Sequence, residues 1–440
     1  MKPAAPSPER TMKRYDLAAS AALLALTLLI AGVFWALLPA EYRQNQSTDY
    51  TAHYEPVARA ILAGRGIVDE TGALATRYPP GFSVLLAGAW GLGRAAGVAD
   101  DTALLAFRLL CAALSTVLLY ALARLVWPMR AALLVGAAWA CYPFFLWITK
   151  QPNSEVPFLP VFFAALFVFW LAVLRRPRAW WLYVLAGLLA GAAMLIRPAA
   201  LGLGGVMAVL VLLLARPLRW PARLGLAALL ALGNLLAVAP WLGAVYAQTG
   251  TFIPLSSGGT LTLKDGLTFL VDEKAYRRAV PLSDDVAALL LTFRDRRAEM
   301  SSTGDVVAIV LDEARQEPVA FLKFTWIKAT RSWYGNDSRT FERPTLFVQA
   351  VYALLILWGN AYAFFARGTP AVARPADLRR MLAGNWLIAA YFWAMTMTAV
   401  PLLRYTLPLM GPLFVALPGV YFSLRALRAG AWASPAPSLE

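Results

Sequence analysis

Two acidic side chains have the type and position that a membrane enzyme needs for proton transfer. Asp49 lies ahead of a short amphipathic helix, which Pro56 can interrupt, and Glu155 directly precedes an apolar run. A carboxylate beside a membrane can act as a general base, and acids next to apolar runs are uncommon and usually functional or paired. The alternative for both is an ordinary acid at the start of a helix.

Two arginines, Arg197 in Leu195–Pro198 and Arg404 in Leu402–Tyr405, each lie at a turn next to apolar runs. Because the guanidinium group forms paired hydrogen bonds with phosphate, either arginine could hold an anionic substrate group. An anchor to lipid phosphate, or an ion pair with Glu155, explains them equally well.

A third candidate site is the Gly- and Ser-rich loop Leu255–Thr260, which Lys264 follows. Its backbone N–H groups could receive a phosphate or a sugar, but the same composition marks any turn. The chain has one histidine, His53, and two cysteines, and their spacing fits no metal site. We therefore predict no cofactor, and a divalent metal is not indicated.

A membrane-embedded scaffold must position these side chains. Of the 440 residues, 60% are hydrophobic and 15% are charged, and the mean hydropathy is +0.60, which excludes a soluble enzyme, a disordered chain and a disulfide scaffold. Ten apolar segments are long enough to cross a bilayer. They lie at 17–38, 103–123, 131–149, 156–174, 180–196, 198–215, 224–246, 344–366, 382–400 and 405–424.

The basic residues indicate how these segments are oriented. With ten spans, eighteen Lys and Arg residues of the termini and short loops lie on one side, and only Lys150, Arg197 and Arg404 lie on the other, as the positive-inside rule requires. Both termini are then cytoplasmic, and segment 80–98 becomes an interfacial or re-entrant helix on the outer side. The net charge of +15 is thus an insertion signal that faces anionic lipid, and we predict no nucleic-acid partner.

We predict an all-α polytopic membrane protein, a bundle of about ten transmembrane helices with interfacial helices on its outer face. The predicted parts are a transmembrane domain (1–425), an outer loop with Asp49 (39–102), an outer loop that covers the site (247–343) and a disordered cytoplasmic tail (426–440). Inside the second loop, Ser283-Asp284-Asp285 and Gly304-Asp305 signal helix starts. Val319–Trp333 has the spacing of a helix on the membrane surface.

Several short motifs follow one another along the chain. They are Asp49, Tyr78-Pro79-Pro80-Gly81, Ser154-Glu155, Ile196-Arg197-Pro198, Pro240-Trp241, Gly250–Pro254, Ser256-Ser257-Gly258-Gly259, Lys328–Tyr334 and Arg404-Tyr405. Their order, over roughly 17–425, resembles bacterial membrane glycosyltransferases of the GT-C type, family 39-like. That group is related to protein mannosyltransferases and to the lipid A aminoarabinose transferase.

The resemblance implies an inverting enzyme that transfers a hexose or pentose from a polyprenyl-phosphate carrier. The acceptor would be an envelope lipid, glycan or protein on the periplasmic face of the inner membrane. Asp49 would be the general base, and Glu155 a second acid that orients Asp49's partner or the acceptor. The expected donor ligands are Arg197, Arg404 and Lys264 for the phosphate, and Tyr50, Tyr78, Ser257, Gly258 and Gly259 for the sugar pocket.

The sequence departs from the family in two places. Tyr50 follows Asp49 where relatives often have a second acid, and Arg77-Tyr78 replaces the Glu-Lys of aminoarabinose transferases, which argues against an aminoarabinose donor and a bound metal. Two other classes stay open: a flippase or transporter of lipid-linked sugars, and an inactive membrane component of a glycan assembly complex. The scarcity of charge inside the spans favours an enzyme over a transporter.

Overall fold

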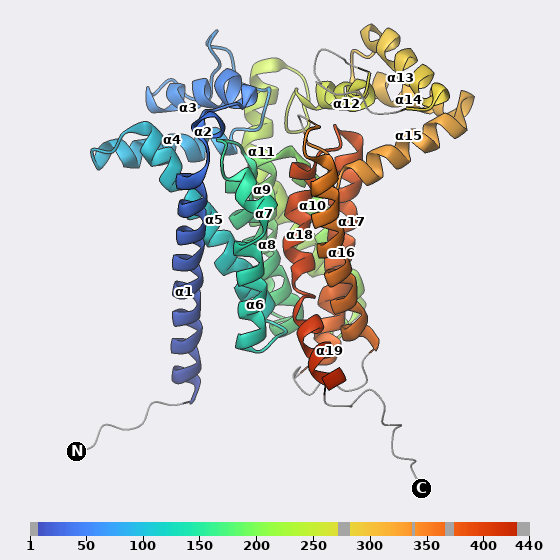
Figure 1. The fold of residues 1–440 in the computed structure, drawn as a ribbon. Helices are drawn as coiled ribbons and strands as arrows, with labels where there is room; N and C mark the ends of the chain where they lie inside the picture. Colours follow the sequence, from blue (N-terminus) through green and yellow to red (C-terminus); the bar gives the residue numbers. More distant parts are fainter. Residues whose placement is uncertain (1–7, 272–281, 337–338, 366–373, 429–440) are drawn as a thin grey trace, which may run out of the picture.

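The computed structural model describes residues 8–271, 282–336, 339–365 and 374–428. Within these ranges the chain is helical, with one isolated β-bridge between Val68 and Leu74. Long helices stand side by side, and short helices gather at one end of the bundle (Figure 1). The predicted all-α fold class is confirmed. Most of the predicted disordered tail, 429–440, lies outside the described residues.

Twelve of the described helices run along the bundle. They are α1 (Pro8–Leu37), α5 (Asp100–Arg124), α6 (Met129–Ala140), α7 (Pro143–Ile148), α8 (Glu155–Arg175), α9 (Trp180–Ile196), α10 (Leu203–Leu214), α11 (Trp220–Thr249), α16 (Glu342–Phe365), α17 (Pro375–Thr398), α18 (Leu403–Phe414) and α19 (Pro418–Arg428). Each of the ten predicted apolar segments coincides with one of these helices or with a consecutive pair. Each pair breaks just before a proline, Pro143 or Pro418, because the residue before a proline disfavours the helical conformation.

Five of the helices in the described ranges, α1, α5, α8, α11 and α16, are long and apolar enough to cross a membrane. A sixth span results if α18 and α19, which meet at a 45° bend, are counted together. Three further helices, α6, α9 and the η2–α10 segment, are apolar but shorter. The exact number of ten spans therefore stays a prediction.

The centre of the bundle is α8, in which Phe158, Phe162, Phe163, Phe169 and Trp170 are completely buried. Beside it, α9 and α11 approach so closely that glycine is required at the crossing. A Cβ atom on Gly187 would lie 2.0 Å from the Leu230 carbonyl oxygen, and one on Gly233 would lie 2.2 Å from that of Val184. Small residues at such crossings allow the backbones of membrane helices to pack directly.

The other elements gather at one end of the bundle, which we call the Asp49 end (Figure 1). They are α2 (Ala40–Arg43), the π-helix η1 (Tyr50–Tyr54), α3 (Glu55–Leu62), α4 (Gly81–Ala95), η2 (Pro198–Ala200), α12 (Gly259–Thr268), α13 (Asp284–Asp295), η3 (Arg296–Ala298), α14 (Thr303–Gln316) and α15 (Pro318–Arg331). Helix α1 begins and α19 ends at the opposite end of the bundle.

Local signals predicted five of these ten short helices, α3, α4, α13, α14 and α15. Helix α13 follows Ser283, and α14 follows Ser302, whose hydroxyl forms a capping box with Asp305. Pro56 does not break a helix: it lies in the first turn of α3, where its missing N–H group costs no hydrogen bond. Helices α12–α15 bury a hydrophobic cluster of their own, which includes Phe293 and Phe324.

Candidate active site

The Asp49 carboxylate is exposed and has one defined partner in its own loop. The Tyr78 hydroxyl donates a hydrogen bond of 2.9 Å to Asp49 Oδ1. The segment before Asp49 is tied to the loop before α8 by one side chain, Gln151. Its Oε1 accepts from the Gln46 N–H group at 2.8 Å, and its Nε2 donates to the Gln44 carbonyl oxygen at 3.0 Å. Gln151 therefore fixes the backbone before Asp49, and Tyr78 orients the Asp49 carboxylate.

Two stacked tyrosines extend from Asp49 into the bundle. The Tyr78 and Tyr54 rings stack with their centroids 4.8 Å apart, and Tyr54 packs edge-on against Phe82. Burial raises the pKa of both phenols, and the nearby charge of Asp49 raises that of Tyr78 further. Both phenols are thus protonated at neutral pH. The Tyr54 side chain also interacts with Ser154, the residue before Glu155.

Beyond Tyr54 lies a charge cluster, which consists of the buried Glu155 and Arg197 and of Arg404, whose side chain is 34% exposed. Arg197 Nη1 lies 3.0 Å from Glu155 Oε2 and donates to the Ser154 hydroxyl at 3.2 Å. Arg404 Nε lies 3.8 Å from Glu155 Oε1. The side chains of Glu155 and Arg197 are only 5% and 8% exposed. Two guanidinium groups around one carboxylate leave this cluster with one net positive charge.

Aromatic and backbone contacts fix the two arginines. Each guanidinium carbon lies 5.0 Å from the centroid of the Tyr405 ring, so both form cation–π contacts with the same ring. The start of α4 presses on the turn before Arg197: a Cβ atom on Gly81 would lie 2.5 Å from the Leu195 carbonyl oxygen. This close approach explains why the Tyr78–Gly81 motif ends in glycine and why it lies beside Arg197.

The Ser257–Gly259 loop is hydrogen-bonded to Thr76 and Arg77, the two residues before Tyr78. The N–H groups of Ser257 and Gly258 donate to the carbonyl oxygens of Thr76 and Arg77, at 2.9 and 3.2 Å. The Ser257 and Thr76 hydroxyls are 3.1 Å apart. A side chain on Gly258 would meet the Arg77 carbonyl oxygen at 2.6 Å. Two of the N–H groups that the sequence offered for phosphate binding are thus used by main-chain carbonyls, while Gly259 begins α12.

Two predicted ligands lie elsewhere in the described part of the chain. Lys264 is on α12, whose main packing partners are α13, α14 and α17. The buried Tyr50 side chain follows Asp49 but faces the charges of Glu55, Arg59 and Arg108. The contacts described above join Asp49, Tyr78, Glu155, Arg197 and Arg404 through Tyr54, and the assignment of Tyr50 and Lys264 to the donor site stays a prediction.

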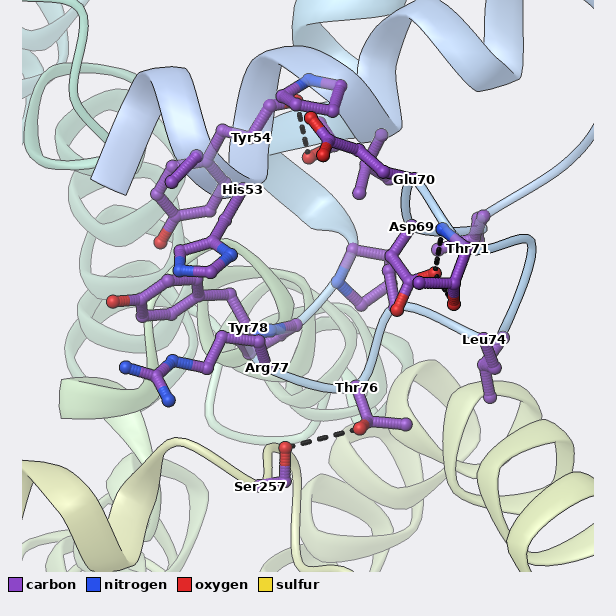
Figure 2. Close-up of a pocket in the computed structure, with 18 residues that line it drawn as sticks. His53, Tyr54, Asp69, Glu70, Thr71, Leu74, Thr76, Arg77, Tyr78 and Ser257 are labelled. Carbon is purple, nitrogen blue, oxygen red and sulfur yellow. Dashed lines mark hydrogen bonds between the residues drawn. The ribbon is translucent and has the colours of Figure 1, made fainter. Parts of the chain in front are cut away.

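A pocket of about 330 Å³ opens beside the tyrosine pair. Figure 2 shows His53 and Tyr54 on one side of it, Asp69, Glu70 and Thr71 across from them, and Thr76 with Ser257 below. Burial and the charge of Arg77 lower the pKa of His53. The sequence analysis did not identify Asp69 and Glu70 as pocket residues. The segment Asp69–Gly72 has the composition of any turn, and no local signal shows that it lies across the pocket from His53.

No group of three or more His, Cys, Asp or Glu side chains suited to a metal occurs in the described ranges. The chemistry available here is a carboxylate base, protonated phenols and guanidinium groups. This combination suits a reaction in which a hydroxyl loses a proton and an anionic group departs.

Comparison with known proteins places this architecture in a class. The family model for dolichyl-phosphate-mannose-protein mannosyltransferases matches residues 79–243. Among solved structures, the chain is similar to the oligosaccharyltransferase AglB of Archaeoglobus fulgidus in complex with an inhibitory peptide and a dolichol-phosphate. The identity is 15%, the TM-score is 0.55, and the alignment covers 97% of this chain and 53% of AglB.

The apo form of the same archaeal enzyme gives 15% identity and a TM-score of 0.55, with 95% of this chain and 53% of that chain covered. ArnT from Cupriavidus metallidurans bound to undecaprenyl phosphate gives 15% identity and a TM-score of 0.43, with coverage of 94% and 81%. No curated protein matches the chain. The chain thus spans about half the length of AglB and has the fold of GT-C membrane glycosyltransferases. Residues 79–243 are similar to the protein mannosyltransferase family model, and this match confirms the predicted resemblance.

Proposed function

We propose that the chain is a glycosyltransferase that uses a polyprenyl-phosphate-linked sugar. The observation that carries this proposal is the line of contacts from Asp49 through Tyr78 and Tyr54 to the cluster of Glu155 and Arg197. The exposed Asp49 carboxylate lies on one side of the stacked Tyr78 and Tyr54 rings, and the net-positive cluster of Glu155, Arg197 and Arg404 lies on the other. The dolichol-phosphate present in the AglB structure supports a polyprenyl-phosphate donor.

In the proposed reaction Asp49 accepts the proton of an acceptor hydroxyl. The resulting oxygen nucleophile attacks the anomeric carbon from the face opposite the phosphate, and the bond from that carbon to the phosphate oxygen breaks with inversion. The electron pair leaves with the polyprenyl phosphate. Arg197 and Arg404 stabilise this leaving group, so that no general acid is needed. Tyr78 holds the carboxylate through its 2.9 Å hydrogen bond.

Glu155 acts in this proposal as a positioning residue for the two arginines. It lies within ion-pair distance of both and is nearly fully buried. It offsets one of the two positive charges and orients the guanidinium planes, while Arg197 Nε has no hydrogen-bond partner in the described part of the chain. A phosphate oxygen can take up this unused donor.

We place the reaction at the periplasmic face of the inner membrane. Arg124 and Arg175 end α5 and α8 at the end of the bundle opposite Asp49, where α1 also begins. The positive-inside rule assigns that end to the cytoplasm, so the Asp49 end faces outward. The acceptor is then an envelope lipid, glycan or protein, because these are the acceptors present on that face.

The test is envelope profiling in a deletion strain of the source organism. Glycolipids, glycans and glycoproteins are compared by mass spectrometry after complementation with wild-type protein, with Asp49→Asn, or with Glu41→Gln as a matched exposed acid on α2. We expect wild type and Glu41→Gln to restore a missing sugar, and Asp49→Asn to insert in the membrane without restoring it. Full restoration by Asp49→Asn would overturn the proposed base.

A further inference from the structure

Arg108 is a buried cation in α5 that the proposed reaction does not use. Its side chain is 5% exposed, and its Nε and Nη1 atoms have no hydrogen-bond partner in the described part of the chain. The guanidinium carbon lies 5.2 Å from the centroid of the Trp35 ring on α1. A cation–π contact of this kind offsets only part of the cost of burying a guanidinium group.

The depth of Arg108 decides what kind of partner can reach it. At 1.5 Å per residue, it lies about 12 Å along α5 from the exposed Asp100 at the start of the helix. Trp35 lies two residues before the end of α1. Both helices are candidate membrane spans. The guanidinium group is therefore near the boundary between headgroups and acyl chains, at the Asp49 end.

The outer surface of α1 and α5, the two helices that enclose Arg108 and Trp35, exposes apolar side chains. Helix α1 exposes Leu29, Val33 and Leu37 at helical spacing, and α5 exposes Leu110 and Leu114. Figure 1 shows α1 at the edge of the bundle, where it packs on α5 and α6. A soluble anion would have to leave water to reach this place, whereas a lipid can cover the leucines with its chain and present its phosphate to the arginine.

We propose that Arg108 binds the phosphate of a membrane lipid held between α1 and α5. The guanidinium fork matches phosphate oxygens with paired N–H donors, and Nε and Nη1 are two such donors. The bound lipid would lie under Tyr50, whose hydroxyl interacts electrostatically with Arg108, and hence beside the Asp49 segment. This site is separate from the Arg197–Arg404 cluster and does not depend on sugar transfer.

The test measures lipid binding to the purified full-length protein in detergent by native mass spectrometry. Three probes are titrated: phosphatidylglycerol, undecaprenyl phosphate, and diacylglycerol with the same acyl chains as the first. Wild type is compared with Arg108→Met and with Arg94→Gln, a half-exposed arginine at the same end of the bundle. We expect at least one phosphate lipid to bind wild type and Arg94→Gln alike, and to bind Arg108→Met about tenfold more weakly.

The phosphate lipid that loses affinity identifies the source of the ligand. If both phosphate lipids bind Arg108→Met as tightly as wild type, or if diacylglycerol binds wild type equally well, the proposal is overturned. Arg108→Lys keeps the positive charge but lacks the paired N–H donors of the guanidinium group. If Arg108→Met does not fold, Arg108→Lys replaces it in the test, and we expect its affinity for the phosphate lipid to lie below that of wild type. Because the readout is binding, its failure is distinct from a failure of the proposed transferase activity.

Discussion

Separating Glu155 from Arg197 is expected to cost far more stability than separating an exposed pair at the same end of the protein. The two atoms are 3.0 Å apart and both side chains are more than nine-tenths buried. At an effective dielectric constant near 20, Coulomb attraction over this distance is about 5 kcal/mol. Removing one partner also leaves a buried charge, a change that costs about 3–5 kcal/mol.

The matched reference is the pair Arg94–Asp100, with a similar distance of 2.8 Å but side chains that are 50% and 26% exposed. Exposed pairs contribute about 0.2–1 kcal/mol. Double-mutant cycles with Arg197→Met and Glu155→Gln, and with Arg94→Gln and Asp100→Asn, isolate each pairwise term. The free energy of unfolding is measured in mixed detergent micelles.

We expect a coupling energy of about 2–4 kcal/mol for the buried pair and less than about 1 kcal/mol for the exposed one. The double variant Arg197→Met/Glu155→Gln should be more stable than Arg197→Met alone, because it no longer buries a carboxylate that has lost its nearer cation. Arg404, 3.8 Å from Glu155, limits the loss in the single variant. Equal coupling energies for the two pairs would refute the view that burial strengthens the interaction between Glu155 and Arg197.

Two further predictions follow from individual side chains. Tyr78→Phe keeps the stack on Tyr54 but removes the hydrogen bond to Asp49, so sugar transfer in membranes should slow about 10- to 100-fold; an unchanged rate would show that Tyr78 does not position the base. Burial lowers the pKa of Lys328 to about 7, below its unfolded value of about 10.4. The unfolded chain then binds a proton that the folded chain lacks between those values, so the unfolding free energy should rise with pH from about 7 to 10. Lys328→Met should flatten this rise in detergent unfolding experiments, and an unaltered slope would contradict the burial argument.

The helices were predictable because their signals are local. The apolar run of α8, the serine before α13 and the capping box of α14 each involve residues within a few positions of one another. A reader of the sequence can therefore locate the elements at the Asp49 end without knowing how they pack. The asymmetry of basic residues likewise needs only the order of the apolar segments.

Roles that depend on partners far away in the sequence were not predictable in the same way. Glu155 was a candidate acceptor ligand, and the structure shows it between Arg197 and Arg404, which are 42 and 249 positions further along. The Ser257 and Gly258 amides were candidate phosphate ligands, and they instead bond to the loop that holds Tyr78. The ion pair with Glu155 was one of the alternatives for the two arginines, and only the structure selected it. Nothing in the sequence indicated the main-chain partners of Ser257 and Gly258.

The sequence by itself determined the membrane-embedded all-α class, the places where the helices lie and the small set of acids and arginines that stand out near one end. Only the tertiary structure decided that Tyr78 contacts Asp49, that one carboxylate serves two arginines and that Arg108 is buried against Trp35. The physical reason is range. Helix formation and capping depend on hydrogen bonds that span about four residues. These contacts instead join residues far apart in the sequence, so they depend on how the helices and loops pack.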